Sequence, residues 1–376
     1  MTNVEYINPR SGGRWSTDAP IWRAPDDGGH VNLTPGKGLT RNEIAPSEIG
    51  LWRYRKSIRI PSADTSTLGE GWTPLVRSDW DGVSILMKCE HMMPSGSFKD
   101  RGTVVLFNYL KQCGTTEILE DSSGNAGASY ATYAAALGLD CRIMVPASAP
   151  VGKKTQIAAM GGRIEAIEGS REDVAVAALK AAEATFYASH NWQPFFIEGT
   201  KTLAFEIWEQ LGFSVPDNIV VPLGYGSNVI GLHVGFLELQ AAGEIDSLPR
   251  IFGAQAANCA ALYAALKAGG TAADFPISAT LADGIASEKP VRIAEVMAAM
   301  RQTGGTIVVA DEDEIAMAFR RLADAGFFVE PTSATAGAVL SRLIGARIVG
   351  REETTVLVLT GHGLKAVANI ARMSEG

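Results

Sequence analysis

One lysine stands where a predicted helix begins, inside the run PSGSFKDRG at residues 94–102. A cation at a helix N-terminus is disfavoured by the helix macrodipole. An amine bound as an imine to an aldehyde avoids this cost, and lysine is the side chain that forms such imines. Lys99 is therefore a candidate nucleophile for a carbonyl compound, although the spacing alone fits a solvated charged turn as well.

Two turns rich in glycine and small polar residues could bind anions. The run GYGSNVIG at 224–231 follows an apolar stretch of strand length, and its free N–H groups suit a phosphate. It is not the dinucleotide fingerprint G-x-G-x-x-G, because Val229 occupies the third glycine position, so a nucleotide-binding dehydrogenase is disfavoured. The run SSGNAGAS at 122–129 could hold a substrate carboxylate on its N–H groups, and an ordinary helix cap is the alternative.

These turns must be positioned by strands and helices that alternate along the chain. We expect strands at 83–89, 117–120, 141–145, 163–167, 218–223, 250–254, 306–310 and 355–360, and helices at 103–112, 128–137, 153–160 and 173–184. Short β-branched runs separated by helices predict an α/β fold with parallel sheets covered on both faces. In such sheets, ligands bind where glycine turns leave the carboxyl ends of strands, and a fourth turn, TGHGLK at 360–365, closes another apolar run.

Composition excludes several other classes of protein. The 376 residues exceed one ordinary core and predict two or three lobes. A net charge of −8 without a basic stripe disfavours nucleic acid as a partner. The four cysteines and five histidines are scattered, which disfavours a zinc site. The chain has neither an 18-residue apolar run nor an apolar leader, so we expect no membrane partner and a cytoplasmic location.

Six short motifs, in order and spacing, resemble one known family. They are LGEGWTPL at 68–75, SFKDRG at 97–102, SSGN at 122–125, EGTKT at 198–202, EPTSA at 330–334 and TGHGLK at 360–365. Together they are similar to the threonine synthase branch of the fold-type II (tryptophan synthase beta-like) enzymes that use pyridoxal phosphate. The serine and threonine dehydratases are relatives of this branch.

The resemblance implies two lobes, each with a central, mostly parallel sheet flanked by helices, and the cofactor in the cleft between them. On this basis we expect an N-terminal arm at 1–50, a large cofactor-binding domain at 51–98 and 201–376, and a small domain for the substrate carboxylate at 99–200. We also expect a homodimer that acts on a small amino acid.

The resemblance also assigns roles to individual residues. Lys99 would form a Schiff base with pyridoxal phosphate and later move protons at the substrate Cα. Asn125 would bond the cofactor's 3-oxygen, Thr360 would contact its pyridine nitrogen, and Ser122 and Ser123 would bind the substrate carboxylate. The phosphate cradle would be formed by Gly224, Tyr225, Gly226, Ser227 and Asn228.

The chain departs from this family in the substrate pocket. Ala126 stands where threonine is usual, and Phe196 stands where an arginine would bind a phosphorylated substrate through a charge-assisted, bidentate contact. Ala366 replaces a usual aspartate, and residues 280–286 resemble the dehydratases more closely. We therefore expect a lyase that carries out α,β-elimination on a small hydroxy- or amino-substituted amino acid, with Ala126 and Phe196 in its substrate site. The alternatives are threonine synthase, which acts on O-phosphohomoserine, and a non-catalytic paralogue that binds the cofactor.

Overall fold

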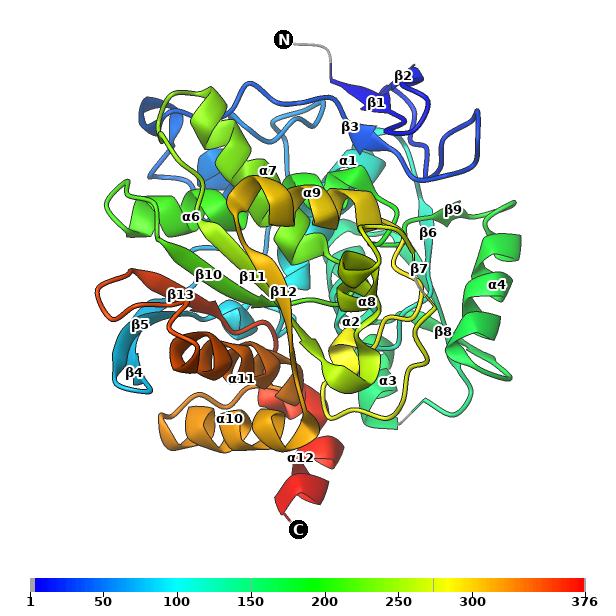
Figure 1. The fold of residues 1–376 in the computed structure, drawn as a ribbon. Coiled ribbons are helices and arrows are strands. Elements are labelled where there is room, and N and C mark those ends of the chain that lie inside the picture. Colours follow the sequence, from blue (N-terminus) through cyan, green and yellow to red (C-terminus); the bar gives the residue numbers. More distant parts are fainter. Residues whose placement is uncertain (1–3, 150, 273, 375–376) are drawn as a thin grey trace.

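The computed structural model describes residues 4–149, 151–272 and 274–374, and within them the strands form three sheets (Figure 1). The largest sheet has the order β12-β11-β10-β13-β5-β4. Its strands are β4 (Leu75–Trp80), β5 (Val83–Lys88), β10 (Asn218–Pro222), β11 (Arg250–Ala256), β12 (Thr306–Ala310) and β13 (Thr355–Val358). All neighbours pair in parallel except the edge strand β4, which runs antiparallel to β5. The predicted parallel-rich α/β fold is confirmed.

Helices cover both faces of this sheet, as the apolar character of β10 requires. Figure 1 shows α6 (Thr202–Gln210), α7 (Ser227–Ala241) and α9 (Ile293–Thr303) on one face, and α10 (Glu312–Asp324) and α11 (Pro331–Gly345) on the other. In α10 the buried residues are Ile315, Ala318, Phe319 and Leu322, which is the spacing of a single helix face. Two further helices are α8 (Ala261–Lys267) and α12 (Val367–Ser374).

A second sheet, with the order β8-β7-β6-β9, is entirely parallel. Its strands are β6 (Glu117–Glu120), β7 (Asp140–Pro146), β8 (Arg163–Ile167) and β9 (Phe186–Tyr187). Its helices are α1 (Lys99–Gln112), α2 (Asn125–Leu137), α3 (Val151–Ala159), α4 (Arg171–Ala181) and α5 (Pro194–Thr200). Ile118 packs in the core that holds α1 and α2, whereas the next residue, Leu119, packs with Val174 of α4. This alternation places helices on opposite faces of the sheet.

The N-terminal segment forms a small sheet that the sequence did not predict. Its strands are β1 (Glu5–Ile7), β2 (Arg14–Ser16) and β3 (Asn32–Leu33), in the order β2-β1-β3. The Tyr6 hydroxyl lies 2.7 Å from that of Tyr109, and the Tyr6 ring meets Phe195 edge-on at 5.9 Å. The segment is thus fastened to α1 and α5. The predicted domain boundaries stay a prediction.

Short 3-10 turns complete the described chain. They cover Arg41–Glu43, Gly50–Tyr54, Glu90–Met92, Ala257–Cys259, Asp283–Ile285 and Gly363–Ala366. Among the described residues, none of the helices has the length and apolar character needed to cross a lipid bilayer.

Two helices begin earlier than the sequence pattern predicts, and both shifts matter for the site. We expected helices from residues 103 and 128, whereas α1 begins at Lys99 and α2 at Asn125. The N-termini of these two helices are hard to predict because their first turns are polar, and serine, glycine and asparagine by themselves favour caps and turns. Lys99 and Asn125 therefore lie at helix N-termini, where the free N–H groups and the positive dipole end are found.

Candidate active site

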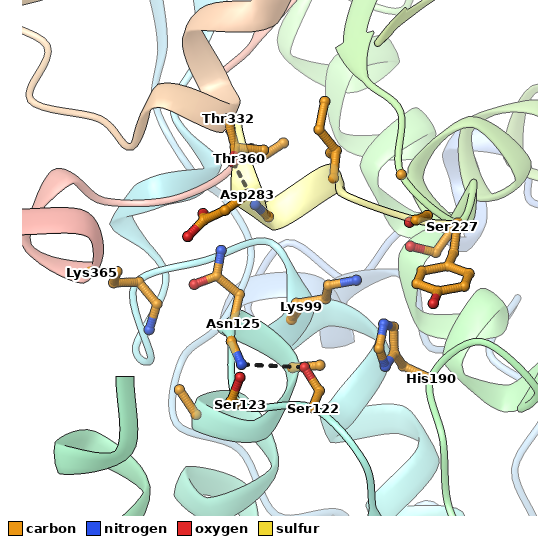
Figure 2. Close-up of a pocket in the computed structure, with 18 of the residues that line it drawn as sticks. Lys99, Ser122, Ser123, Asn125, His190, Ser227, Asp283, Thr332, Thr360 and Lys365 are labelled. Atoms are coloured by element: carbon orange, nitrogen blue, oxygen red, sulfur yellow. Dashed lines mark hydrogen bonds between the residues drawn. The ribbon is translucent and has the colours of Figure 1, made fainter. Parts of the chain in front are cut away.

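A cavity of about 1120 Å³ is lined by residues from both large sheets. The predicted residues that line it are Lys99, Ser122, Ser123, Asn125, Ala126, Gly224, Tyr225, Gly226, Ser227, Asn228 and Thr360. Turns far apart in the sequence meet here because each leaves the carboxyl end of a parallel strand. Figure 2 shows Lys99 in the middle of this group, between Asn125 on one side and Ser227 and His190 on the other.

The Lys99 side chain is half-buried in the cavity wall. Its Nζ lies 4.7 Å from the centre of the Phe98 ring and 5.7 Å from that of Phe196. Burial lowers the pKa of Lys99 to about 8, while the carboxylates of Glu120 and Glu330 oppose this shift. A lysine with a lowered pKa presents more of the unprotonated amine at neutral pH, which is the form that attacks a carbonyl group.

The residues after Lys99 anchor its helix to neighbouring turns and helices. Asp100 accepts hydrogen bonds from the Ser129 hydroxyl at 2.6 Å and from the Ser95 N–H at 2.7 Å. Arg101 is fully buried and donates to Glu90 at 2.6 Å and to Glu206 at 2.9 Å. Because both charged neighbours point into the protein, the start of α1 holds Lys99 towards the cavity.

The glycine turn before α7 has the shape of an anion cradle. Gly226 has φ 105°, and a Cβ there would lie 2.5 Å from Cγ2 of Val296. A Cβ at Gly224 would lie 3.2 Å from the Ile285 backbone. The first N–H groups of α7 lack partners within the helix, and the two glycine positions of the turn before it have little room for a side chain. These residues fit the phosphate of pyridoxal phosphate.

Asn125 and Thr360 lie at the other end of the cavity. The Asn125 amide nitrogen donates to both carboxylate oxygens of Glu330, at 2.9 and 3.0 Å. The Thr360 hydroxyl lies 3.1 Å from that of Ser333, which also accepts from the Thr360 N–H at 2.9 Å. Both residues are held in place, and their predicted contacts with the cofactor stay predictions.

The loop before α2 brings two serines and a helix N-terminus to the cavity. The Gly124 N–H donates to the Ser122 hydroxyl at 3.3 Å, and Ser123 lies beside it in Figure 2. Ala126 is buried in the first turn of α2 and also lines the cavity. Helix N–H groups and two hydroxyls can together bind a carboxylate, which is the role predicted for Ser122 and Ser123.

Phe196 lies behind the cavity wall and is not among the described residues that line it. Its fully buried ring packs against Gly102 of α1, where an added Cβ would lie 2.5 Å from the ring. The predicted direct contact between Phe196 and the substrate therefore has no support in this arrangement. The reason is the crossing of α5 over α1, which directs the ring inward.

The sequence reasoning missed several charged or titratable residues of the cavity. The His190 Nδ1 lies 2.9 Å from Oε1 of Glu120, and Arg171 donates to Asp121 at 2.7 Å. Glu120 ends β6 and Asp121 follows it, directly before the serine turn, and carboxylates at the carboxyl end of a strand were an available signal. No comparable pattern marks His190, which lies in the loop before α5.

Acidic residues outnumber lysine and arginine in the described cavity wall. The acids are Asp121, Glu172, Asp283, Glu288 and Glu330, and the cations are Lys99, Arg171, Lys289 and Lys365. Two cations are already paired, Arg171 with Asp121 at 2.7 Å and Lys289 with Glu172 at 3.0 Å. Among the described residues, no group of histidine, cysteine and acidic side chains is arranged to hold a metal ion.

Comparison with known proteins places this site in context. A family model described as "Pyridoxal-phosphate dependent enzyme" matches residues 66–361. The threonine synthase of Methanosarcina acetivorans is 34% identical over 334 residues, which cover 86% of this chain and 82% of that protein. The threonine synthase of Methanocaldococcus jannaschii is 34% identical over 350 residues, covering 90% and 86%. The processed form of threonine deaminase isoform 2 from Solanum lycopersicum shares the fold, with TM-score 0.73, 22% identity and coverage of 95% and 98%.

Proposed function

The chain belongs to the family of pyridoxal-phosphate dependent enzymes, and from this premise we propose that it is a lyase that carries out α,β-elimination. Its substrate would be a small amino acid with a hydroxyl or amino substituent at Cβ. The products would be water or ammonia from the substituent and an unsaturated amino acid, which hydrolyses to a keto acid and ammonia. Bound pyridoxal phosphate withdraws electrons from the substrate Cα and so makes its proton acidic.

The residues of the cavity would divide the remaining tasks. Lys99 would hold the cofactor and, once released by the substrate, would accept the Cα proton. Ser122, Ser123 and the N-terminus of α2 would hold the substrate carboxylate, which fixes the orientation of the Cα–H bond. Thr360 would offer the pyridine nitrogen a neutral hydroxyl in place of a carboxylate.

The excess of acidic residues in the cavity supports a substrate whose side chain carries no phosphate. The described cavity wall holds five carboxylates, among them Asp283 and Glu330, beside four lysine and arginine side chains. A phosphorylated side chain would add negative charge close to these carboxylates, and like charges in a partly buried site repel. A neutral or cationic side chain meets no such repulsion.

Threonine synthase is the second candidate, and two observations favour it. The relatives at 34% identity carry that name. In the described part of the chain, Lys365 has no carboxylate within ion-pair distance, since its Nζ donates to the Ser95 carbonyl at 2.8 Å and to the Gln156 side chain at 2.7 Å. One cation of the cavity could therefore bind a phosphate.

A product screen separates the two candidates. Purified holoenzyme would be incubated with serine, threonine, 2,3-diaminopropionate and O-phosphohomoserine, and keto acid, threonine and inorganic phosphate would be measured. Keto acid from an unphosphorylated substrate, with little phosphate release, supports the lyase. Efficient phosphate release together with threonine formation would show that the enzyme is a threonine synthase and not the proposed lyase. The Lys99→Ala variant serves as the blank for both products.

A further inference from the structure

Glu120 and His190 form a buried pair next to the cavity, and the proposed elimination assigns neither of them a role. The His190 Nδ1 lies 2.9 Å from Oε1 of Glu120. Glu120 is fully buried at the end of β6, and His190 is 6% exposed and lines the cavity. Figure 2 shows the His190 ring on the side of the cavity towards which the Lys99 amine points.

The second nitrogen of the histidine is available to a ligand. Within the described residues, Nε2 of His190 has no hydrogen-bond partner. Oε2 of Glu120 is also buried without a partner. A pair with a purely structural task would normally have its polar atoms satisfied, because an unsatisfied buried polar group is costly. Two open positions in one pair therefore point to a group that acts on something in the cavity.

The surroundings of the pair favour its neutral forms. Burial lowers the pKa of His190 well below its ordinary value, and the positive charges of Lys99 and Arg171 act in the same direction. Burial and the nearby Asp121 raise the pKa of Glu120 well above its ordinary value, while Arg171 and Lys99 oppose this. A neutral carboxyl group donates a hydrogen bond to Nδ1 and keeps its own proton, so the imidazole proton is on Nε2, facing the cavity.

Aromatic rings complete the surroundings of the imidazole. The Phe196 ring centre lies 5.7 Å from that of His190, and the Tyr225 ring meets it edge-on at 6.3 Å. An arginine at position 196 would add a cation close to His190 and Lys99. The phenyl ring found there fills the same place without charge, so it preserves the neutral imidazole.

We propose that His190, positioned by Glu120, is the catalytic residue that protonates the departing hydroxyl group, an inference that rests on the proposed elimination. The Cα–H electron pair becomes the Cα=Cβ bond, and its proton goes to Lys99. The Cβ–O bond breaks, its electron pair stays on oxygen, and the Nε2 proton of His190 converts the leaving hydroxyl to water. The Glu120 proton then moves to Nδ1, and the Lys99 ammonium returns one proton to the pair, so the charge of the site is restored.

The experiment compares two leaving groups, because only one of them needs a proton. Serine loses a hydroxyl group, whereas β-chloroalanine loses chloride, and both yield pyruvate. In His190→Gln and Glu120→Gln, kcat/KM for serine should fall by about 10²- to 10⁴-fold, the usual contribution of a positioned acid. The rate with β-chloroalanine should stay close to that of the wild type. His233→Gln is the matched control, since His233 is a buried histidine of α7 that contacts Gln302 at 2.9 Å and does not line the cavity.

Two further measurements support this comparison: one tests folding and cofactor binding in the variants, and the other tests proton transfer in the wild-type enzyme. Cofactor absorbance and the thermal midpoint of each variant should match the wild type, which shows that folding and cofactor binding are intact. In the wild-type enzyme, the solvent deuterium isotope effect on the rate should be larger for serine than for β-chloroalanine. Equal solvent effects would contradict a proton transfer to the leaving group.

The outcomes also separate this inference from the function on which it rests. Equal losses with both substrates, or no loss with either, would overturn the role of His190 alone, since the elimination itself would still be observed. The wild-type holoenzyme could also form no keto acid from β-chloroalanine and none from a hydroxy amino acid. That result would contradict the proposed elimination, and with it this inference.

Discussion

The amine of Lys99 stands 5.7 Å from the centre of the Phe196 ring, so an aromatic surface lies behind the candidate nucleophile. At this position the resemblance to threonine synthases leads one to expect an arginine. An aromatic neighbour adds no positive charge, whereas a guanidinium would raise the cost of protonating Lys99 further. The two residues belong to α1 and α5, whose close packing sets this distance.

Borohydride reduction of the holoenzyme should attach the cofactor to Lys99. Peptide mapping by mass spectrometry would locate the label. Lys88 and Lys201 are matched controls, because both are buried lysines tied to carboxylates, Lys88 to Glu206 and Lys201 to Glu238 at 2.9 Å. A label on either of these would refute the assignment. Lys99→Ala should lose turnover while it retains some cofactor through the phosphate cradle.

The pKa of Lys99 predicts how fast the apoenzyme captures its cofactor. With a pKa of about 8, the fraction of free amine rises roughly tenfold between pH 7 and pH 9 and then levels off. Stopped-flow absorbance would follow formation of the bound cofactor across this range, with N-acetyl-lysine methyl amide as the reference for ionisation of the cofactor itself. A capture rate that still rises tenfold per pH unit above pH 9 would mean that burial leaves the amine with an ordinary pKa.

Phe196→Arg should destabilise the protein without creating a phosphate site. The side chain is fully buried between α1 and α5, so an arginine there would be an uncompensated buried charge, which typically costs about 3–5 kcal/mol. Urea unfolding would measure this loss, and Phe196→Leu, which keeps an apolar side chain, should lose less. Because the ring lies behind the cavity wall, phosphate release from O-phosphohomoserine should not increase, even in combination with Ala126→Thr. An increase would show that position 196 reaches the substrate.

Gly226→Asp should abolish tight cofactor binding. The residue has φ 105°, its added Cβ would lie 2.5 Å from Val296, and its charge would face the phosphate. Replacing a charge-assisted contact by repulsion should weaken affinity by several kcal/mol, on the order of 10²-fold or more. Equilibrium dialysis of apoenzyme against pyridoxal phosphate would measure it. Gly243→Asp is the control, because Gly243 also has positive φ, at 75°, but has open space around it. Equal affinity in the two variants would place the phosphate elsewhere.

Much of the fold and part of the site follow from local patterns in the sequence. The segments of β6, β8, β10 and β12 have strand length and contain β-branched residues, and each forms a strand close to its predicted limits. The glycine turn before α7 is predicted as an anion site from its sequence, because glycines between an apolar run and a helix leave backbone N–H groups free. The motif around Lys99 also predicts the residue that holds the cofactor, although that prediction depends on the resemblance to a known family.

Other features depend on contacts between segments far apart in the chain. Glu120 and His190 are 70 residues apart, and only the pairing of β6 with β9 brings the ends of their segments together. The sequence also suggested that Phe196 contacts the substrate, but the direction of its side chain depends on how α5 crosses α1. Whether a carboxyl group is buried, and hence whether it holds a proton, depends on the whole surrounding structure rather than on residue type. For this reason the sequence identifies the cofactor chemistry, while the tertiary structure decides which acids and bases share the cavity with it.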